Sequence, residues 1–293
     1  MMRNWFLAIR PKTLSASAVP VLMAAALTIT DHVFNLPVFL SCLFAALLLQ
    51  IGSNLANDYF DFKKKADTDE RLGPVRVTQA GLIPPNQVKF AFIFTFILAF
   101  FIGLYSVYVG GLPILYLGLI CIALAILYTG GPWPLAYLGL GEIFALIFFG
   151  PVPVTATYYI MAKNISVESA VVGLIPGFFA MAMISINNLR DITTDLVANK
   201  RTVAVIIGER LARYESAFFL LLAPILPVFF LIIFFQRYSL IPIIFITFIT
   251  LPTAKKILNN SISRDFNNHL SFAAKINLLS GIAYIILLLL TGQ

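Results

Sequence analysis

The stretch PVFLSCLFAALLLQIGSNLANDYFDFKKKADTD (residues 37–69) decides the fold, because an apolar run ends there in a cluster of carboxylates. A membrane-spanning α-helix needs about 20 predominantly apolar residues, and residues 37–57 supply that length. Asp58, Asp61 and Asp67 follow within ten positions. The stretch therefore predicts a transmembrane helix with a reactive polar end at the membrane surface.

The composition of the whole chain agrees with this prediction. Its 293 residues are 60% hydrophobic and 11% charged, with a mean hydropathy of +0.94, whereas a soluble domain carries about 25% charged residues. No cleavable signal is evident, so the first apolar run is read as the first span. Cys42 and Cys121 each lie inside an apolar run, which argues against a disulfide framework. The chain is expected to be an all-α integral membrane protein.

Apolar runs recur nine times and predict nine transmembrane helices within one domain, residues 1–293. The expected spans are 14–31, 37–57, 88–108, 112–128, 141–160, 168–188, 213–235, 239–257 and 271–290. The two long hydrophilic loops between them are 58–87 and 189–212. Chemistry on polar groups is therefore expected in these two loops.

Basic residues divide unevenly between the two sides that nine spans define. All Lys and Arg except Lys163 and Arg237 fall on the side of the N-terminus and of both hydrophilic loops. Cytoplasmic loops carry an excess of Lys and Arg. We therefore expect the N-terminus inside, the C-terminus outside, and an active site that faces the cytoplasm from the cell (cytoplasmic) membrane.

Two helix ends carry the same pattern, an Asn followed by spaced Asp on one helical face. The pattern comprises Asn54, Asp58 and Asp61 after the second span, and Asn187, Asp191 and Asp195 after the sixth. It recurs four helices apart in the same orientation. This predicts two four-helix repeats plus one further helix.

Clustered carboxylates repel one another unless a cation neutralises them. The clusters contain carboxylate and amide oxygens but neither Cys nor His, which favours Mg²⁺ or Ca²⁺ over zinc or copper. Mg²⁺ typically binds one or two carboxylates plus substrate phosphate oxygens. Nearby basic residues would bind the remaining oxygens: Lys63, Lys64, Arg71, Arg76, Arg190, Lys200 and Arg201. Single charged loops at a membrane surface are often merely solvated, but two aligned clusters favour a metal-bridged diphosphate site.

Several motifs resemble the UbiA superfamily of intramembrane prenyltransferases. They are RPKTL (10–14), NLANDYFD (54–61), the step from Asp61 to Asp67, RLGPVR (71–76), YTGGPWPLAYLGLGE (128–142) and INNLRDITTDLVANKRTVAVIIG (186–208). Within the superfamily they are most similar to the menaquinone-pathway branch, the 1,4-dihydroxy-2-naphthoate polyprenyltransferases. Lys65 and Asn199 stand where that branch commonly has glycine, and we expect altered local backbone freedom there rather than lost chemistry.

The resemblance implies the reaction. An allylic polyprenyl diphosphate would give its prenyl group to 1,4-dihydroxy-2-naphthoate, with loss of CO₂, to form demethylmenaquinol. Mg²⁺, as two ions bound with the diphosphate, would stabilise the leaving group. The implied partners are the polyprenyl diphosphate, the aromatic acceptor and the lipid bilayer, with neither nucleic acid nor an obligate protein partner.

The resemblance also implies roles for individual residues. The expected metal ligands are Asp58, Asp61, Asp67, Asp191 and Asp195, and all of these except Asp67 are expected to be catalytic together with Tyr128. The expected diphosphate contacts are Asn54, Arg10, Lys12, Arg71, Asn187, Lys200 and Arg201. Tyr128 would stabilise the allylic cation through its π-face, and Tyr59 and Tyr137 are weaker candidates. Glu142 would either orient the acceptor or favour the dipole of the fifth spanning helix.

Three alternatives remain open. Another UbiA-type enzyme, with an acceptor such as 4-hydroxybenzoate, would share the metal site, although RPKTL and NNLRD argue against it. A CDP-alcohol phosphatidyltransferase would carry a single motif of the D-G-x2-A-R type, which this chain lacks. A cation transporter would need acids at mid-membrane depth, whereas nearly all the acids here lie at the expected cytoplasmic ends.

Overall fold

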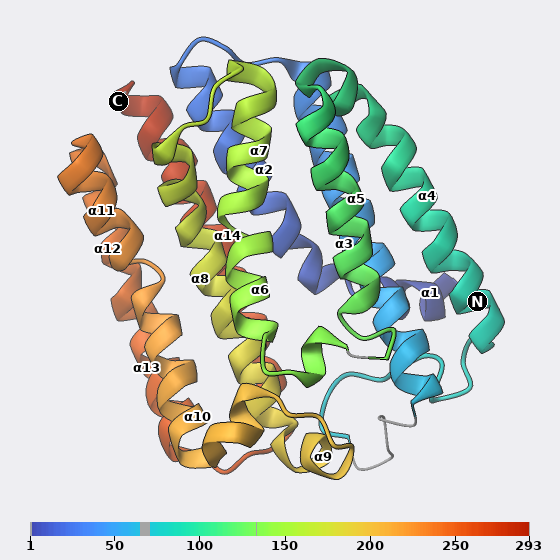
Figure 1. Cartoon of the computed structure of the whole chain (residues 1–293). Coiled ribbons are helices and arrows are strands. Elements are labelled where there is room, and N and C mark those ends of the chain that lie inside the picture. The colour runs from blue at the N-terminus through green and yellow to red at the C-terminus, as the bar shows by residue number, and fades with distance from the viewer. Residues whose placement is uncertain (1, 65–70, 133, 293) are drawn as a thin grey trace.

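The computed structural model describes residues 2–64, 71–132 and 134–292, and every regular element within these ranges is a helix (Figure 1). The helices are α1 (Met2–Ile9), α2 (Pro11–Thr30), α3 (Leu36–Lys63), α4 (Pro85–Gly110), α5 (Leu112–Leu127), η1 (Leu135–Tyr137), α6 (Gly141–Phe148), α7 (Pro151–Ala162), α8 (Val167–Arg190), α9 (Ile192–Val197), α10 (Val203–Leu222), α11 (Leu226–Phe235), η2 (Tyr238–Leu240), α12 (Ile241–Ile244), α13 (Ile246–Asn259) and α14 (Phe266–Thr291).

Eight helical segments in the described ranges are long and apolar enough to cross a membrane. Each corresponds to one of the expected spans, and the chain is an integral membrane protein. The remaining expected span, 112–128, coincides with α5, whose 16 residues fall short of the roughly 20 that cross a bilayer. The count of nine spans, the orientation and the two repeats therefore stay predictions.

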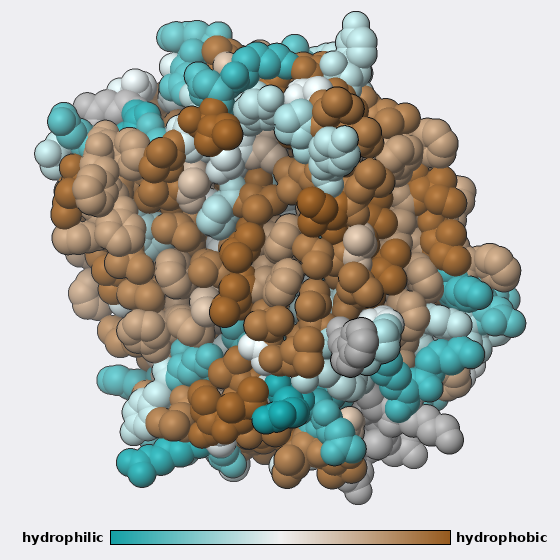
Figure 2. Space-filling model, viewed as in Figure 1, coloured by the Kyte–Doolittle hydropathy of each residue, from teal (hydrophilic) through white to brown (hydrophobic). Residues whose placement is uncertain are grey.

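The surface carries the pattern of a membrane protein. Figure 2 shows hydrophobic residues across the middle of the face in view, with hydrophilic residues gathered at its two ends. Large apolar side chains such as Phe90, Phe94 and Phe101 on α4 are more than half exposed. A lipid environment would cover them, since apolar patches of this size are rare on soluble monomers.

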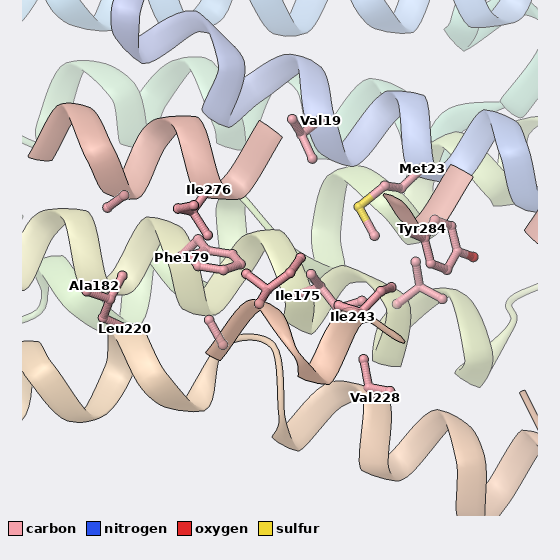
Figure 3. Packing of buried hydrophobic residues seen from close by; sticks show 14 of the residues in the cluster. Val19, Met23, Ile175, Phe179, Ala182, Leu220, Val228, Ile243, Ile276 and Tyr284 are labelled. Carbon is pink, nitrogen blue, oxygen red and sulfur yellow. The ribbon is translucent and has the colours of Figure 1, made fainter. Parts of the chain in front are cut away.

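The main core surrounds α8, which packs against α2, α6, α7, α10, α11 and α14. In Figure 3, Ile175 and Phe179 of α8 lie among Met23 of α2, Leu220 of α10 and Ile276 of α14. All five side chains are buried. Because lipid tails are as apolar as these side chains, close packing rather than transfer from water holds the helices together.

The fifth expected span is divided into α6 and α7 at Gly150–Pro151, where proline removes a backbone hydrogen bond. The division lets the backbone of Gly150 approach α8 very closely. A Cβ atom at Gly150 would lie 2.5 Å from the carbonyl oxygen of Gly173 and 2.7 Å from the Cα of Gly177. Small residues four apart permit such approach in membrane helices, and the contact holds α6 alongside α8.

One face of α14 is polar although it is buried. Asn277, Ser280 and Tyr284 lie on that face, at most 1% exposed. α14 packs along α2 and α8, so the polar row faces the bundle interior. Polar side chains within a membrane normally face the interior, because lipid offers them no hydrogen bonds.

The helix ends position the polar residues. α3 continues to Lys63 and therefore carries Asp58 and Asp61 on its last turns. α8 ends at Arg190, and α9 and a tight turn lead to α10. Asn199 in that turn has a left-handed backbone with φ of 55°, a conformation that asparagine tolerates better than most residues. This explains how it stands where glycine was expected, while Lys65 lies outside the described residues.

Candidate active site

Asp58 fastens the loop after α3 to the helix end. Its carboxylate is 2% exposed and accepts backbone hydrogen bonds from the N–H of Val77 at 3.0 Å and of Thr78 at 3.1 Å. The charge is held by N–H donors, as in many buried carboxylates. Asp58 thereby brings the expected loop 58–87 back over the end of α3.

Asp61 and Asp195 meet at one cation. Lys200 Nζ lies 3.5 Å from Asp61 Oδ1 and 3.8 Å from Asp195 Oδ1. On its other side, Asp61 Oδ2 accepts a hydrogen bond of 2.9 Å from Arg76 Nη2. The side chains of Asp61, Asp195 and Lys200 are buried or nearly so, and that of Lys200 is 12% exposed. The two carboxylate clusters predicted from the sequence are thus brought together at the end of the bundle.

The charge balance around Asp195 is incomplete. The pKa of Asp195 is raised to about 7, chiefly by burial; Lys200 and Arg71 oppose the shift, and the carboxylates of Asp191 and Asp61 add to it. The loss of solvation therefore outweighs the attraction of the nearby cations. A cation that entered the cluster would favour its charged form.

At the end of α8, Asp191 forms ion pairs with two arginines, Arg190 and Arg71. Arg190 Nε donates a hydrogen bond of 2.8 Å to Asp191 Oδ1, and its Nη2 bonds Asp191 Oδ2 and the side-chain oxygen of Asn187. Arg71 Nη2 lies 3.9 Å from Asp191 Oδ2. Arg190 also donates to Asn267 Oδ1 at 2.8 Å, which ties this corner to the start of α14.

Several expected diphosphate contacts make other interactions. Asn54 Nδ2 donates to the carbonyl oxygen of Ile9 at 2.8 Å and to Thr13 Oγ1 at 2.9 Å, so it joins α3 to the start of α2. Lys12 and Arg201 are exposed at the same end of the bundle. Arg10 has a left-handed backbone between α1 and α2. Their roles stay predictions, and Asp67 lies outside the described residues.

Tyr128 lies beside the carboxylates. It directly follows the last residue of α5, close enough to interact with the charges of Glu142, Asp61 and Asp195. A Cβ atom at Gly141 would lie 3.0 Å from the Tyr128 hydroxyl oxygen, so glycine there leaves room for the tyrosine. This position is compatible with the expected contact to an allylic cation.

The two other tyrosine candidates differ from each other. Tyr59 packs against Phe60 and Phe92 in the core between α3 and α4. The Tyr137 ring lies under two cations, with Lys64 Nζ 4.9 Å and Lys200 Nζ 5.1 Å from its centroid. Tyr137 therefore makes cation–π contacts with two ammonium groups of the site, and its expected role stays a prediction.

The carboxylates can accept a divalent cation. No three His, Cys, Asp or Glu side chains are assembled around one point in residues 2–64, 71–132 and 134–292. Mg²⁺ needs only one or two carboxylates when phosphate oxygens complete its shell. Asp61 and Asp195 already converge on a cation, the Lys200 ammonium. This donor set, ringed by Arg and Lys, fits Mg²⁺ bound together with a diphosphate.

The structure brings two further asparagines to the site, Asn188 and Asn267, to which the sequence motifs assign no role. Asn267 donates to the carbonyl oxygen of Leu72 at 2.8 Å and so connects α14 to the loop after α3. Asn188 Nδ2 donates to Glu142 Oε1 at 2.8 Å. The sequence signal for Asn188 was its place beside Asn187 on α8, one turn before Asp191.

Comparisons with known proteins show the family and the fold. The model of the UbiA prenyltransferase family matches residues 17–279. A solved UbiA homologue from Archaeoglobus fulgidus, bound to GPP and Mg²⁺, has a TM-score of 0.67 at 14% identity and covers 97% of this chain and 99% of its own. At that identity the likeness shows the fold.

Curated relatives are closer in sequence. The 1,4-dihydroxy-2-naphthoate octaprenyltransferase of Escherichia coli (strain K12) is 38% identical over 219 residues, which cover 73% of this chain and 71% of that protein. The human UbiA prenyltransferase domain-containing protein 1 is 30% identical over 291 residues, covering 96% and 82%. The chain therefore belongs to the UbiA prenyltransferase family, and it is a prenyl-transferring enzyme of the membrane.

Proposed function

We propose that this chain is a Mg²⁺-dependent 1,4-dihydroxy-2-naphthoate polyprenyltransferase that acts as one domain, residues 1–293. It would join the polyprenyl group of a polyprenyl diphosphate to the ring and release CO₂ and diphosphate, giving demethylmenaquinol. The meeting of two carboxylate clusters at Lys200 carries the proposal. Bacterial relatives with 34–38% identity bear the name 1,4-dihydroxy-2-naphthoate octaprenyltransferase, which supports the choice of acceptor.

The carboxylates and the cations have complementary tasks. Asp61 and Asp195 would hold Mg²⁺, two ions in all with the help of Asp58, Asp67 and Asp191. The bound ions supply charge stabilisation to the departing diphosphate. The basic side chains that now neutralise the acids would turn to the diphosphate oxygens: Arg71, Arg76, Arg190 and Lys200. Arg10, Lys12, Arg201, Asn54 and Asn187 remain proposed contributors at the rim.

The tyrosine and the apolar interior would protect the allylic cation. Tyr128, inward of the carboxylates, would face the cation with its ring. The partly buried position of this tyrosine would help to exclude water, which otherwise captures such a cation. The prenyl tail would lie along the apolar helices, on which large Phe side chains are exposed.

We also propose the orientation that the basic residues favour. The site would face the cytoplasm. Of all Lys and Arg, only Lys163 and Arg237 fall on the opposite side. A reporter enzyme that is active only outside the cytoplasm, fused after residue 292, would be active for an outward C-terminus and silent for an inward one.

One assay tests the proposed activity. Purified enzyme in detergent would receive a polyprenyl diphosphate, Mg²⁺, and either 1,4-dihydroxy-2-naphthoate or 4-hydroxybenzoate in separate tubes, each with an EDTA control. Prenylated, decarboxylated naphthoquinol in the first tube alone, abolished by EDTA, is the expected result. Product with 4-hydroxybenzoate alone would retain the diphosphate site and overturn the acceptor. Full activity in EDTA would overturn the metal assignment.

A further inference from the structure

A second polar cluster lies deeper in the bundle than the aspartates. It joins Glu142 at the start of α6, Ser185 and Asn188 on α8, and Glu215 and Ser216 on α10. Ser185 Oγ lies 2.7 Å from Ser216 Oγ and donates to Glu215 Oε2 at 3.4 Å. Three helices thus contribute to it, and the charges of Glu142 and Glu215 are close enough to interact.

Glu142 has a carboxylate oxygen that nothing in the described chain uses. The residue is 2% exposed. Its Oε1 accepts the hydrogen bond of Asn188, but its Oε2 is buried with no hydrogen-bond partner among the described residues. An acid that served only the dipole of α6 could stay solvated, whereas a buried carboxylate with an open acceptor costs free energy unless a donor arrives.

Glu142 lies near residues of the proposed reaction, Tyr128 and the end of α8. Asn188 precedes Asp191 by three residues on α8, about 4.5 Å along the axis toward the bundle interior. Gly141, the neighbour of Glu142, approaches the Tyr128 hydroxyl, and the charge of Glu142 acts on that tyrosine. A ring that attacks a prenyl carbon held below the diphosphate would lie at this depth.

We propose that Glu142 binds a hydroxyl group of the aromatic acceptor through Oε2 and takes its proton as the new carbon–carbon bond forms. Asn188 holds the carboxylate in place through Oε1 and acts as a positioning residue. Glu215 and the two serines support α8 and α10 around it. The inference rests on the proposed function, since it needs an acceptor that carries a phenolic hydroxyl.

The step balances without a further reactant. The ring carbon that bears the carboxyl group bonds to the prenyl carbon, and the prenyl C–O bond breaks with its electron pair leaving on diphosphate. The neighbouring hydroxyl becomes a ring carbonyl, and its proton moves to Glu142 Oε2. The C–CO₂ bond then breaks, its electron pair restores the aromatic ring, and the carbonyl oxygen takes the proton back from Glu142.

The test compares Glu142→Gln with wild type and with Glu168→Gln. Glutamine keeps an oxygen for Asn188 but cannot take the proton. Glu168 is a matched control, because it is an acid at the opposite end of α8, paired with Arg237. We expect Glu142→Gln to lower kcat about 100-fold or more, with Mg²⁺-dependent binding of the prenyl diphosphate unchanged. Glu168→Gln is expected to keep wild-type kcat.

A second acceptor separates a chemical role from a structural one. The acceptor is offered with the hydroxyl next to the reacting carbon blocked as a methyl ether. If Glu142 takes the proton of that hydroxyl, the methyl ether removes the step in which Glu142 acts. Wild type and Glu142→Gln should then prenylate the ether with the same low kcat, so the losses in kcat from the variant and from the ether do not multiply. Losses that multiply, or a Glu142→Gln variant with wild-type kcat, would overturn the inference while leaving the proposed function standing. A wild-type enzyme that prenylates no aromatic acceptor would overturn both.

Discussion

Replacing Lys200 by Met tests whether the ammonium occupies the place of a metal ion. Lys200 Nζ lies within 4 Å of carboxylate oxygens from both clusters, Asp61 and Asp195. Methionine fills a similar volume without charge. Without added metal, the variant leaves the two acids without the ammonium group between them. With added metal, the place of the ammonium group is open to a divalent cation.

The magnitude follows from the distances. Two unit charges 3.5 Å apart attract with about 5 kcal/mol at an effective dielectric constant of about 20. Removing one partner of a buried pair typically costs about 3–5 kcal/mol. Because the pKa of Asp195 is already raised to about 7, this acid escapes part of the cost by taking a proton. We therefore expect a loss of about 3 kcal/mol at pH 8 and less at pH 6.

The assay is thermal unfolding in detergent, with EDTA or with Mg²⁺ and inorganic diphosphate. In EDTA at pH 8, Lys200→Met should unfold about 6 °C or more below wild type. Mg²⁺ with diphosphate should raise the Tm of the variant more than that of wild type, because no ammonium must leave. Lys89→Met, at an exposed position of α4, is the control and should match wild type. An equal or smaller metal-induced rise in Lys200→Met would refute the reasoning.

Three further predictions follow from other contacts. Asp58→Asn leaves one of two loop N–H groups without an acceptor, so it should cost about 1–3 kcal/mol and speed amide exchange in the loop after α3, measured by mass spectrometry. In metal-free protein, the raised pKa of Asp195 means that the folded state binds the extra proton between about pH 3.8 and 7. The free energy of unfolding should therefore fall as pH rises through that window, and Asp195→Asn should flatten the slope. Gly177→Val would force a Cβ to 2.6 Å from the carbonyl oxygen of Leu146 and should cost at least 1–3 kcal/mol, whereas Gly103→Ala, with nothing within 4 Å, should be silent in the same melt.

The helix positions could be read from the sequence because their signals are local. Apolar runs of bilayer length mark the spans, and a proline follows closely on the start of α2, α3, α4, α5 and α7. The face-aligned acids predicted that two helix ends would carry the site. The Gly150–Pro151 pair is a sequence signal for the division between α6 and α7. Hydropathy averaged over the length of a span hides this signal, so α6 and α7 were expected as one helix.

The pairing within the site could not be read in the same way. Asp61 bonds Arg76, fifteen residues on, and Asp195 approaches Lys200, yet many basic residues in the two loops were equally eligible partners. Asn54 shares a helical face with the acids, and its amide nevertheless turns to the start of α2. Such choices depend on how loops fold over helix ends, and neither periodicity nor spacing specifies that.

The polar row of α14 has a consequence for how the protein is made. A helix that carries Asn277, Ser280 and Tyr284 on one face is a poor partner for lipid, and it packs mainly against α2 and α8. α2 leaves the ribosome long before α14 does, so its inner face must wait beside lipid or an insertion factor for a partner still being synthesised. The contact between α2 and α14, the earliest and latest spanning helices, therefore forms last. Ribosome stalling before α14 should leave a chain that quality-control proteases recognise.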